Sequence, residues 1–333
     1  MNKFYIENEE DLRVLIVNTA RKKNISEAII EKDYWVTFIL DYLFNENELK
    51  EYFTFKGGTS LSKCFGLIER FSEDIDLILD WQILGYEKNE PWIERSNTKQ
   101  YKFNKEINIK TEVFLRDELL KILEKDLKNL GFEFSIDSID PQTISCKYPK
   151  IFKSNYLTQN IRLEIGSLAA WTPSIDVKIS LIIGEAYPNL FKEKTNIRTV
   201  SAERTFWEKA TILHHEANRP ESSSMPHRYA RHFYDLYKIG NSDIKNKALG
   251  DKDLLKKVIN FKVKFYPRKW AKYEEALNGR LRLVPDEYRF SELEKDYKAM
   301  SEMIYGEYPQ LEEIIKTLQK LENEINSQQA LLL

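Results

Sequence analysis

The feature that most constrains the fold of this chain is the run Phe-Lys-Gly-Gly-Thr-Ser-Leu-Ser-Lys at residues 55–63, followed by Arg-Phe-Ser-Glu-Asp-Ile-Asp-Leu-Ile-Leu at residues 70–79. Apolar residues before the glycines predict a strand over 52–56, and the alternation after them predicts another over 73–80. A glycine turn and a short helix over about 59–67 join the two. The pattern therefore predicts a strand–turn–helix–strand unit.

The second strand carries two acids on one side. Asp74 and Asp76 are two positions apart, so their side chains point to the same face, while Ile75, Leu77 and Leu79 point to the other. The apolar face marks a core strand, so the acids are held in place beside each other. A divalent cation relieves the repulsion between paired carboxylates, and Mg²⁺, or Mn²⁺ in its place, is the usual one next to phosphates.

The glycine turn offers an anion site beside these acids. Gly57 and Gly58 expose backbone N–H groups at a helix start, and Thr59 and Ser60 add hydroxyls. A Gly-Gly-Thr-Ser sequence alone is often only a turn, and an Asp-x-Asp pair alone is often a solvated edge. Together they predict phosphoryl or nucleotidyl transfer.

Composition sets wider limits. The 333 residues suffice for two domains, and 42% hydrophobic with 31% charged residues is typical of a globular chain. The net charge of −2 gives no support for nucleic-acid binding. The two cysteines, Cys64 and Cys146, form no framework, and no signal peptide or membrane-spanning run is present, so we expect a cytoplasmic protein.

Periodicity predicts an α+β protein in two parts, with a boundary near residue 190. The first part, 1–190, combines a small mixed sheet with flanking helices, and the second, 191–333, is helical. Residues 81–110 have few periodic signals and are predicted to form a loop or insertion, and 176–183 fits either a strand or a helix. The other predicted helices are 8–23, 26–47, 111–130, 201–218, 228–240, 251–265, 289–304 and 309–326; a hairpin is predicted over 132–148 and a strand over 160–167.

These motifs resemble a known superfamily. Gly57-Gly58-x-x-Leu61 with Asp74-x-Asp76 resembles the first motif of polymerase-β-like nucleotidyltransferases, although the gap between its two halves is a few residues longer than usual. The full string is similar to the AbiEii family of nucleotidyltransferase toxins, which includes the MenT toxins. Further similar segments are 31–36, 204–214 and 231–237, so the resemblance spans roughly residues 26–240.

The resemblance implies a third carboxylate on a neighbouring strand. Glu164 fits, because Arg162 and Glu164 alternate with apolar residues and share a face; Asp176 is the competing candidate. The implied metal ligands are thus Asp74, Asp76 and Glu164. Ser72, two positions before Asp74, matches a serine of the family and is expected on the same face.

The resemblance also assigns residues outside the acidic strand. It implies that Lys209 reaches the nucleotide phosphates and that Asp235 orients Lys209 or touches the nucleotide; an ion pair between helices is the plainer alternative. Lys63 is expected either at the triphosphate or in solvent. Lys32 and Asp33 also match the family, with an ion pair bracing the acidic strand as one suggestion.

The histidines and one apolar stripe both favour structural roles. All four histidines (His214, His215, His227 and His232) lie within 19 residues, but their spacing favours polar helix-surface positions over a metal site. Phe206, Ala210 and Leu213 form one stripe at helical spacing and are predicted to be core.

The implied function is that of a bacterial toxin, paired with an antitoxin and associated with phage defence, which transfers a nucleotide from an NTP to an RNA, in characterised family members to the 3′ end of tRNA. The helical second domain would close the nucleotide cleft. The alternatives are NMP transfer to a protein hydroxyl and an NTP-binding regulatory module without turnover. Residues 262–273, rich in lysine and aromatics, fit either an RNA-facing surface or a solvated helix face.

Overall fold

The computed structural model describes residues 3–72, 74–153 and 160–330. The chain divides into two compact units. The first runs up to Cys64 and resumes over Phe71–Val200; the second combines Phe65–Arg70 with the chain from Ser201 onward. In the described part of the chain, no helix combines the length and apolarity that a membrane span needs.

The first unit is built on a mixed sheet with strand order β3-β4-β5-β2-β1-β7-β6. β2 pairs with β5 in parallel and with β1 in antiparallel orientation, and β1 pairs with β7 in parallel. The prediction of an α+β fold with a small mixed sheet is confirmed. The strands are β1 (Phe53–Lys56), β2 (Asp74–Leu79), β3 (Glu133–Ile136), β4 (Thr143–Lys147), β5 (Asn160–Gly166), β6 (Ser174–Ile179) and β7 (Thr195–Val200).

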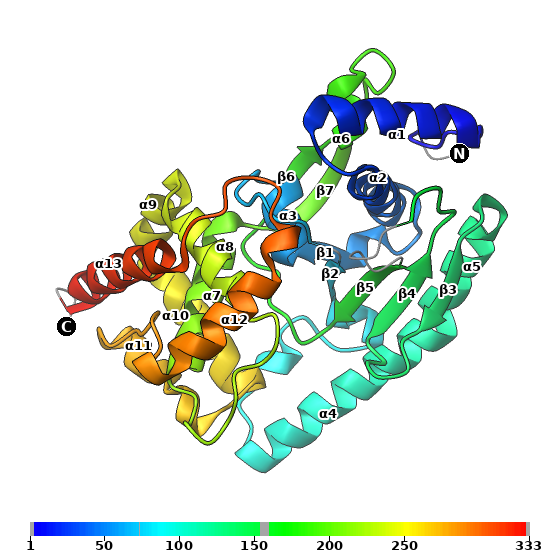
Figure 1. Ribbon diagram of the computed structural model, residues 1–333. Helices are drawn as coiled ribbons and strands as arrows, with labels where there is room; N and C mark the ends of the chain where they lie inside the picture. The colour runs from blue at the N-terminus through cyan, green and yellow to red at the C-terminus, as the bar shows by residue number, and fades with distance from the viewer. Residues whose placement is uncertain (1–2, 73, 154–159, 331–333) are drawn as a thin grey trace. The chain divides into compact units, whose positions relative to one another are not determined.

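Helices of the first unit pack on the sheet, and Figure 1 shows α5 beside β3 at one end. They are α1 (Glu9–Lys23), α2 (Glu27–Asp41), α3 (Gly57–Lys63), α4 (Asn97–Phe114), α5 (Leu120–Leu127) and α6 (Ile182–Ala186). A capping serine, Ser26, begins α2 by accepting the N–H of Ile29. Trp35 and Phe38 of α2 join Leu77 of β2 in one hydrophobic core, so the apolar side of β2 is buried as predicted.

The central helix α2 is buried along most of its length, charged residues included. Glu31 accepts the backbone N–H groups of Ile151 at 2.6 Å and Phe152 at 3.0 Å, which satisfies its carboxylate inside the protein. Asp33 forms an ion pair with Lys63 of α3. The buried charges of α2 therefore fix neighbouring loops and helices.

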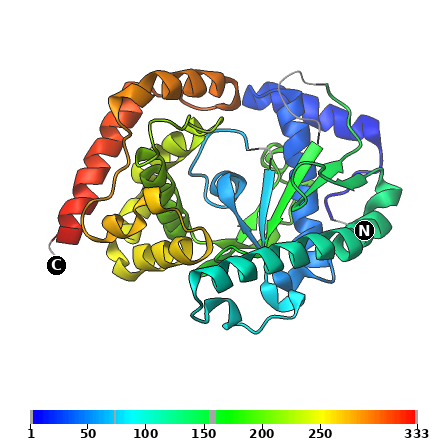
Figure 2. The ribbon, with the colours of Figure 1, turned by 90° about the horizontal axis from the view of Figure 1, so that it is seen from below.

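The prediction of a loop over residues 81–110 is wrong for its second half. α4 begins at Asn97 and continues through a π-helical turn (Leu115–Leu119) into α5, and Figure 2 shows the three as one long helix in teal. The buried side of α4 includes Gln100 and Thr111, whose hydroxyl donates to the carbonyl of Ile107 at 2.8 Å. Because polar residues interrupt the apolar stripe, the helical period was hidden.

The boundary between the units also involves a strand that the sequence pattern did not reveal. β7 pairs with β1 and extends the first unit to Val200, whereas we placed the domain boundary near residue 190. The ambiguous segment 176–183 contains both expected structures, because β6 ends at Ile179 and α6 begins at Ile182.

The second unit is helical, as predicted. Its helices are α7 (Ala202–Ala217), α8 (Ala230–Gly240), α9 (Asp243–Gly250), α10 (Lys252–Phe265), α11 (Tyr273–Leu277), α12 (Phe290–Ala299) and α13 (Leu311–Ala330). α7 packs against α8, α9 and α10, and α13 packs against α8. The predicted core stripe of Phe206, Ala210 and Leu213 on α7 is fully buried. The short segment Phe65–Arg70 joins this unit through a β-bridge between Arg70 and Ile304.

Candidate active site

Three acidic residues meet on one face of the sheet in the first unit. The parallel register of β2 and β5 sets Asp76 opposite Glu164 and Asp74 opposite Arg162. On both strands the alternate residues are buried in the core, so these polar residues share the opposite face. Neighbouring strands lie about 4.8 Å apart, so the structure brings Glu164 beside the aspartates.

The competing candidate, Asp176, lies elsewhere. It is an exposed residue on β6, opposite Arg198 of β7. β6 forms the edge of the sheet, and both β1 and β7 separate it from β2. Of the two candidates for a third carboxylate, only Glu164 is next to Asp76.

The glycine turn packs directly on the carboxylate of Asp76. Gly57 has φ +83°, and a Cβ placed on it would lie 1.9 Å from Oδ2 of Asp76. The first position of the turn therefore requires glycine twice over, for its backbone angle and for the space that the carboxylate occupies. The glycine turn and the Asp-x-Asp strand of the sequence motif are therefore in direct contact through Gly57 and Asp76.

The hydroxyls and the lysine of the turn have partners within the protein. The Thr59 hydroxyl donates to the carbonyl of Asp74 at 2.5 Å, and the Ser60 hydroxyl donates to the carbonyl of Gly57 at 2.9 Å. The ammonium of Lys63 pairs with Asp33, and both side chains are buried. These contacts fasten α3 to β2 and α2, and the predicted phosphate contacts of the three side chains stay a prediction.

Ser72 lies just outside the acidic strand. β2 begins at Asp74, so the two-residue alternation that predicted Ser72 on the acidic face does not extend to it. Its backbone carbonyl lies 3.4 Å from the Thr59 hydroxyl. Ser72 is therefore close to the start of α3.

An arginine lies among the acids, and the sequence analysis noted it only as a neighbour of Glu164. Nε of Arg162 is 3.4 Å from Oε1 of Glu164 and 3.8 Å from Oδ1 of Asp74. Its Nη1 donates to Oδ2 of Asp137 at 2.7 Å. Partial burial raises the pKa of Glu164, and the charges of Asp74 and Asp76 raise it further, while Arg162 opposes both effects. The alternation of β5 could have indicated Arg162, but Asp137 comes from a distant turn.

The donor set fits a hard divalent cation in its chemistry. Asp74, Asp76 and Glu164 supply carboxylate oxygens, which Mg²⁺ prefers, and their mutual repulsion would be relieved by a cation. Among the described residues, no three His, Cys, Asp or Glu side chains already form a cluster that could hold a metal ion. The guanidinium of Arg162 is a positive group within 4 Å of the carboxylates of Asp74 and Glu164.

A second charged cluster is buried in the helical unit. Asp235 of α8 accepts from Nε of Arg70 at 2.6 Å, from Nη2 of Arg70 at 2.8 Å and from Nζ of Lys209 at 2.7 Å. Nδ1 of His232 lies 3.1 Å from Nζ of Lys209. Burial disfavours the charged form of Asp235, but the two cations outweigh it and hold its pKa well below the usual range.

The predicted pair of Lys209 and Asp235 is thus found, and Arg70 is the member that sequence reasoning missed. Arg70 and Lys209 carry two positive charges against one carboxylate. Burial and the neighbouring cations keep the pKa of His232 well below 6.5, so that imidazole is neutral and can accept from Lys209. The Asp235 carboxylate therefore binds two cationic groups, with a neutral imidazole beside one of them.

His214 and His215 contribute to the packing of the helical unit. His214 is buried and not on the helix surface as predicted: its Nδ1 accepts the N–H of Arg282 at 2.9 Å and its Nε2 lies 3.0 Å from the carbonyl of Lys272. His215 stacks on Trp270 with ring centroids 4.2 Å apart.

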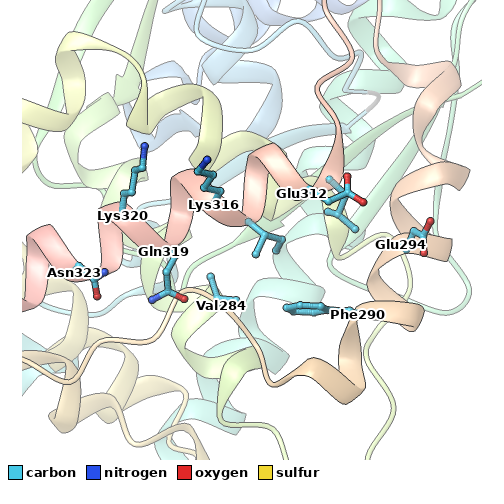
Figure 3. A pocket seen from close by; sticks show the side chains of 10 residues that line it. Val284, Phe290, Glu294, Glu312, Lys316, Gln319, Lys320 and Asn323 are labelled. Carbon is cyan, nitrogen blue, oxygen red and sulfur yellow. The ribbon is translucent and has the colours of Figure 1, made fainter.

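The helical unit also contains a pocket of about 510 Å³. Figure 3 shows Val284 and Phe290 lying across from α13, which contributes Lys316 and Lys320 to the lining. None of the residues that line it was a predicted site residue. The acidic strand face and the Arg70–Lys209–Asp235 cluster therefore remain the candidate functional groups.

A mixed sheet with a glycine turn packed on the acidic strand, followed by a helical unit, defines a nucleotidyltransferase fold. The chain matches the family described as "Nucleotidyl transferase AbiEii toxin, Type IV TA system" over residues 39–321, and it belongs to that family. The sequence-based resemblance to the AbiEii family is thereby confirmed.

The solved structures that are similar to this chain include MenT4 and JHP933. MenT4, a nucleotidyltransferase toxin from Mycobacterium tuberculosis H37Rv, is 18% identical, with a TM-score of 0.47, over 96% of this chain and 98% of that one. JHP933 from Helicobacter pylori is 15% identical, with a TM-score of 0.44, over 91% of this chain and 94% of that one. No curated protein matches the chain.

Proposed function

We propose that this toxin transfers a nucleoside monophosphate from an NTP to an RNA, with the 3′ end of tRNA as the acceptor. The observation that carries the proposal is the meeting of Asp74, Asp76 and Glu164 on one face of the sheet, with the Gly57 turn packed on Asp76. Nucleotidyl transfer needs ligands for a divalent cation next to a place for phosphates. The two requirements meet at this strand end.

In the proposed reaction, the acceptor hydroxyl oxygen forms a bond to the α-phosphorus of the NTP. The bond from that phosphorus to the bridging oxygen of the β-phosphate breaks, pyrophosphate leaves, and the hydroxyl proton is released. Mg²⁺ or Mn²⁺ bound by Asp74, Asp76 and Glu164 would supply positive charge at the phosphates and lower the pKa of the acceptor hydroxyl. Gly57 and Gly58 would offer backbone N–H groups to the phosphates, with Thr59, Ser60, Lys63 and Ser72 as their neighbours.

We include Lys209 and Asp235 in the machinery because Asp235 holds the buried ammonium of Lys209 in place at 2.7 Å. An ammonium is a compact point charge that suits a phosphate group. Asp235 would then orient Lys209 for that contact.

The choice of an RNA acceptor is supported by one segment of the helical unit. Residues 262–272 contain Lys262, Lys264, Arg268, Lys269 and Lys272 and no acid, although the whole chain has a net charge of −2. Tyr266 in the same segment is 51% exposed and offers a ring for base stacking. We place the reaction in the cytoplasm, where the free cysteines Cys64 and Cys146 are stable, with an antitoxin as the partner.

The test is transfer of label from each of the four NTPs to total tRNA by the purified protein, with Mg²⁺ or Mn²⁺. Sequencing of RNA 3′ ends identifies the acceptor and the added base, and the double variant Asp74→Ala, Asp76→Ala is the control. Transfer that the double variant loses supports the proposal. Label found on protein, detected by mass spectrometry, or no transfer with any NTP, would overturn it in favour of protein modification or of nucleotide binding without turnover.

A further inference from the structure

Arg162 is held from one side by a rigid acceptor. Nη1 of Arg162 donates to Oδ2 of Asp137 at 2.7 Å. The other oxygen of Asp137 accepts the backbone N–H groups of Ile139 at 2.8 Å and Asp140 at 3.1 Å. These bonds lock the Asp137 carboxylate into its turn, so it is a fixed anchor for the guanidinium.

The opposite edge of the same guanidinium faces the acidic strand. Nε of Arg162 lies 3.4 Å from Glu164 and 3.8 Å from Asp74, which are long contacts beside the 2.7 Å bond to Asp137. The three acids would otherwise repel one another on neighbouring strands. The positive charge of Arg162 therefore offsets part of the negative charge of these acids, but its shortest contact is with Asp137.

We propose that Arg162 is the counter-ion of the acidic site when no divalent cation is bound, and that it competes with that cation for Asp74 and Glu164. Asp137 weakens the competition, because it keeps the guanidinium from closing on the two acids. When a cation arrives, the two long contacts are given up and the short bond to Asp137 is kept. This inference rests on the proposed function, since it takes the three acids as the cation ligands.

The proposal predicts opposite effects for two neighbouring substitutions. Arg162→Gln removes the competing charge and should tighten Mn²⁺ binding about tenfold, the effect of one positive charge about 6 Å from a divalent ion in a largely aqueous surrounding. Asp137→Asn weakens the anchor, so the guanidinium closes on Asp74 and Glu164 and Mn²⁺ binding should weaken severalfold. In a protein that already carries Arg162→Gln, the change Asp137→Asn should have little further effect, because the competitor is gone.

The experiment measures Mn²⁺ affinity by electron paramagnetic resonance on the full-length protein without NTP. Arg116→Gln is the charge-matched control, because Arg116 is an exposed arginine of the same unit that pairs with Asp117. Circular dichroism verifies the fold of each variant. Arg162→Lys, which keeps the charge, should bind Mn²⁺ nearly as the wild type does. Arg162→Met, which also removes the charge, replaces the glutamine variant should that one not fold.

An unchanged or weaker Mn²⁺ affinity in Arg162→Gln would overturn the inference, as would an equal effect of Asp137→Asn in the presence and absence of Arg162. Weaker NTP binding by Arg162→Gln at unchanged Mn²⁺ affinity would make Arg162 a phosphate ligand and would also overturn it. Asp76→Asn tests the proposed cation site independently of the role of Arg162: if this variant loses Mn²⁺ binding, the cation site stands whatever Arg162 does. If wild type and Asp76→Asn bind Mn²⁺ equally, the cation site itself fails.

Discussion

The contact between the glycine turn and Asp76 makes a sharp prediction for Gly57→Ala. The added Cβ would lie 1.9 Å from Oδ2, 2.6 Å from Cγ and 3.0 Å from Cβ of Asp76. Rotation of the terminal carboxylate alone cannot relieve contacts with all three atoms. Either the turn or the whole Asp76 side chain must move.

The cost has two parts. An alanine at φ +83° costs about 1–2 kcal/mol, because its Cβ meets its own backbone in the left-handed region. Overpacking against a neighbouring side chain costs about 1–3 kcal/mol more. We therefore expect Gly57→Ala to lower the free energy of unfolding by about 2–5 kcal/mol, and the Tm by roughly 5–15 °C for a unit of this size.

Gly85→Ala is the matched control, since Gly85 has φ +85° and nothing lies within 4 Å of the position of its Cβ. It should lose only the backbone part, about 1–2 kcal/mol, and keep nucleotidyl transfer. Gly57→Ala should also lose at least about a hundredfold in transfer rate, because a displaced Asp76 no longer faces Glu164. Equal loss of stability and equal activity in the two variants, by thermal unfolding and label transfer, would refute the reasoning.

Three further predictions concern the charged groups. Asp235→Asn should lower the free energy of unfolding by about 3 kcal/mol at pH 7, since it leaves two buried cations without their carboxylate. Because the folded pKa of Asp235 is lowered, its stabilising contribution is present above the unfolded pKa of about 3.9 and is lost as the pH falls. Urea unfolding curves of variant and wild type should therefore converge as the pH falls from about 5 to about 3 and below, and a difference that does not change with pH would contradict this. Asp74→Asn combined with Asp76→Asn should abolish transfer while raising or keeping the Tm, because it removes charge repulsion; a large fall in Tm would assign the acids a structural role. Arg268→Gln combined with Lys269→Gln should reduce the slope of log affinity for tRNA against log salt by about 1.5; an unchanged slope would place the RNA elsewhere.

The acidic face could be predicted from the sequence because its signal is local. Alternation places Asp74 and Asp76 on one face of their strand, whereas Glu164 followed from the family resemblance, and the choice between Glu164 and Asp176 needed the strand order. The glycine motif also indicates the turn, but not that Gly57 touches Asp76.

Contacts between distant segments could not be predicted in this way. Arg70 and Asp235 are 165 positions apart, and nothing in the local pattern of Arg70 marks it as a partner of α8. The anchor of Arg162 is Asp137, from another strand end, and β7 enters the sheet beside β1 from more than a hundred residues away. α4 was missed for a different reason, since Gln100 and Thr111 break its apolar stripe, and their hydrogen bonds to Asn104 and Ile107 cannot be seen in the sequence.

Because Phe65–Arg70 belongs to the helical unit, that unit can be completed only late in the synthesis of the chain. The ribosome releases Arg70 long before Lys209, Asp235 and Ile304 exist, so the segment must wait for its partners until most of the chain has been synthesised. A truncated product therefore cannot complete the buried cluster. Conversely, residues 201–333 expressed alone lack the guanidinium that Asp235 binds, and supplying Phe65–Arg70 as a separate peptide or as an N-terminal fusion should restore their stability.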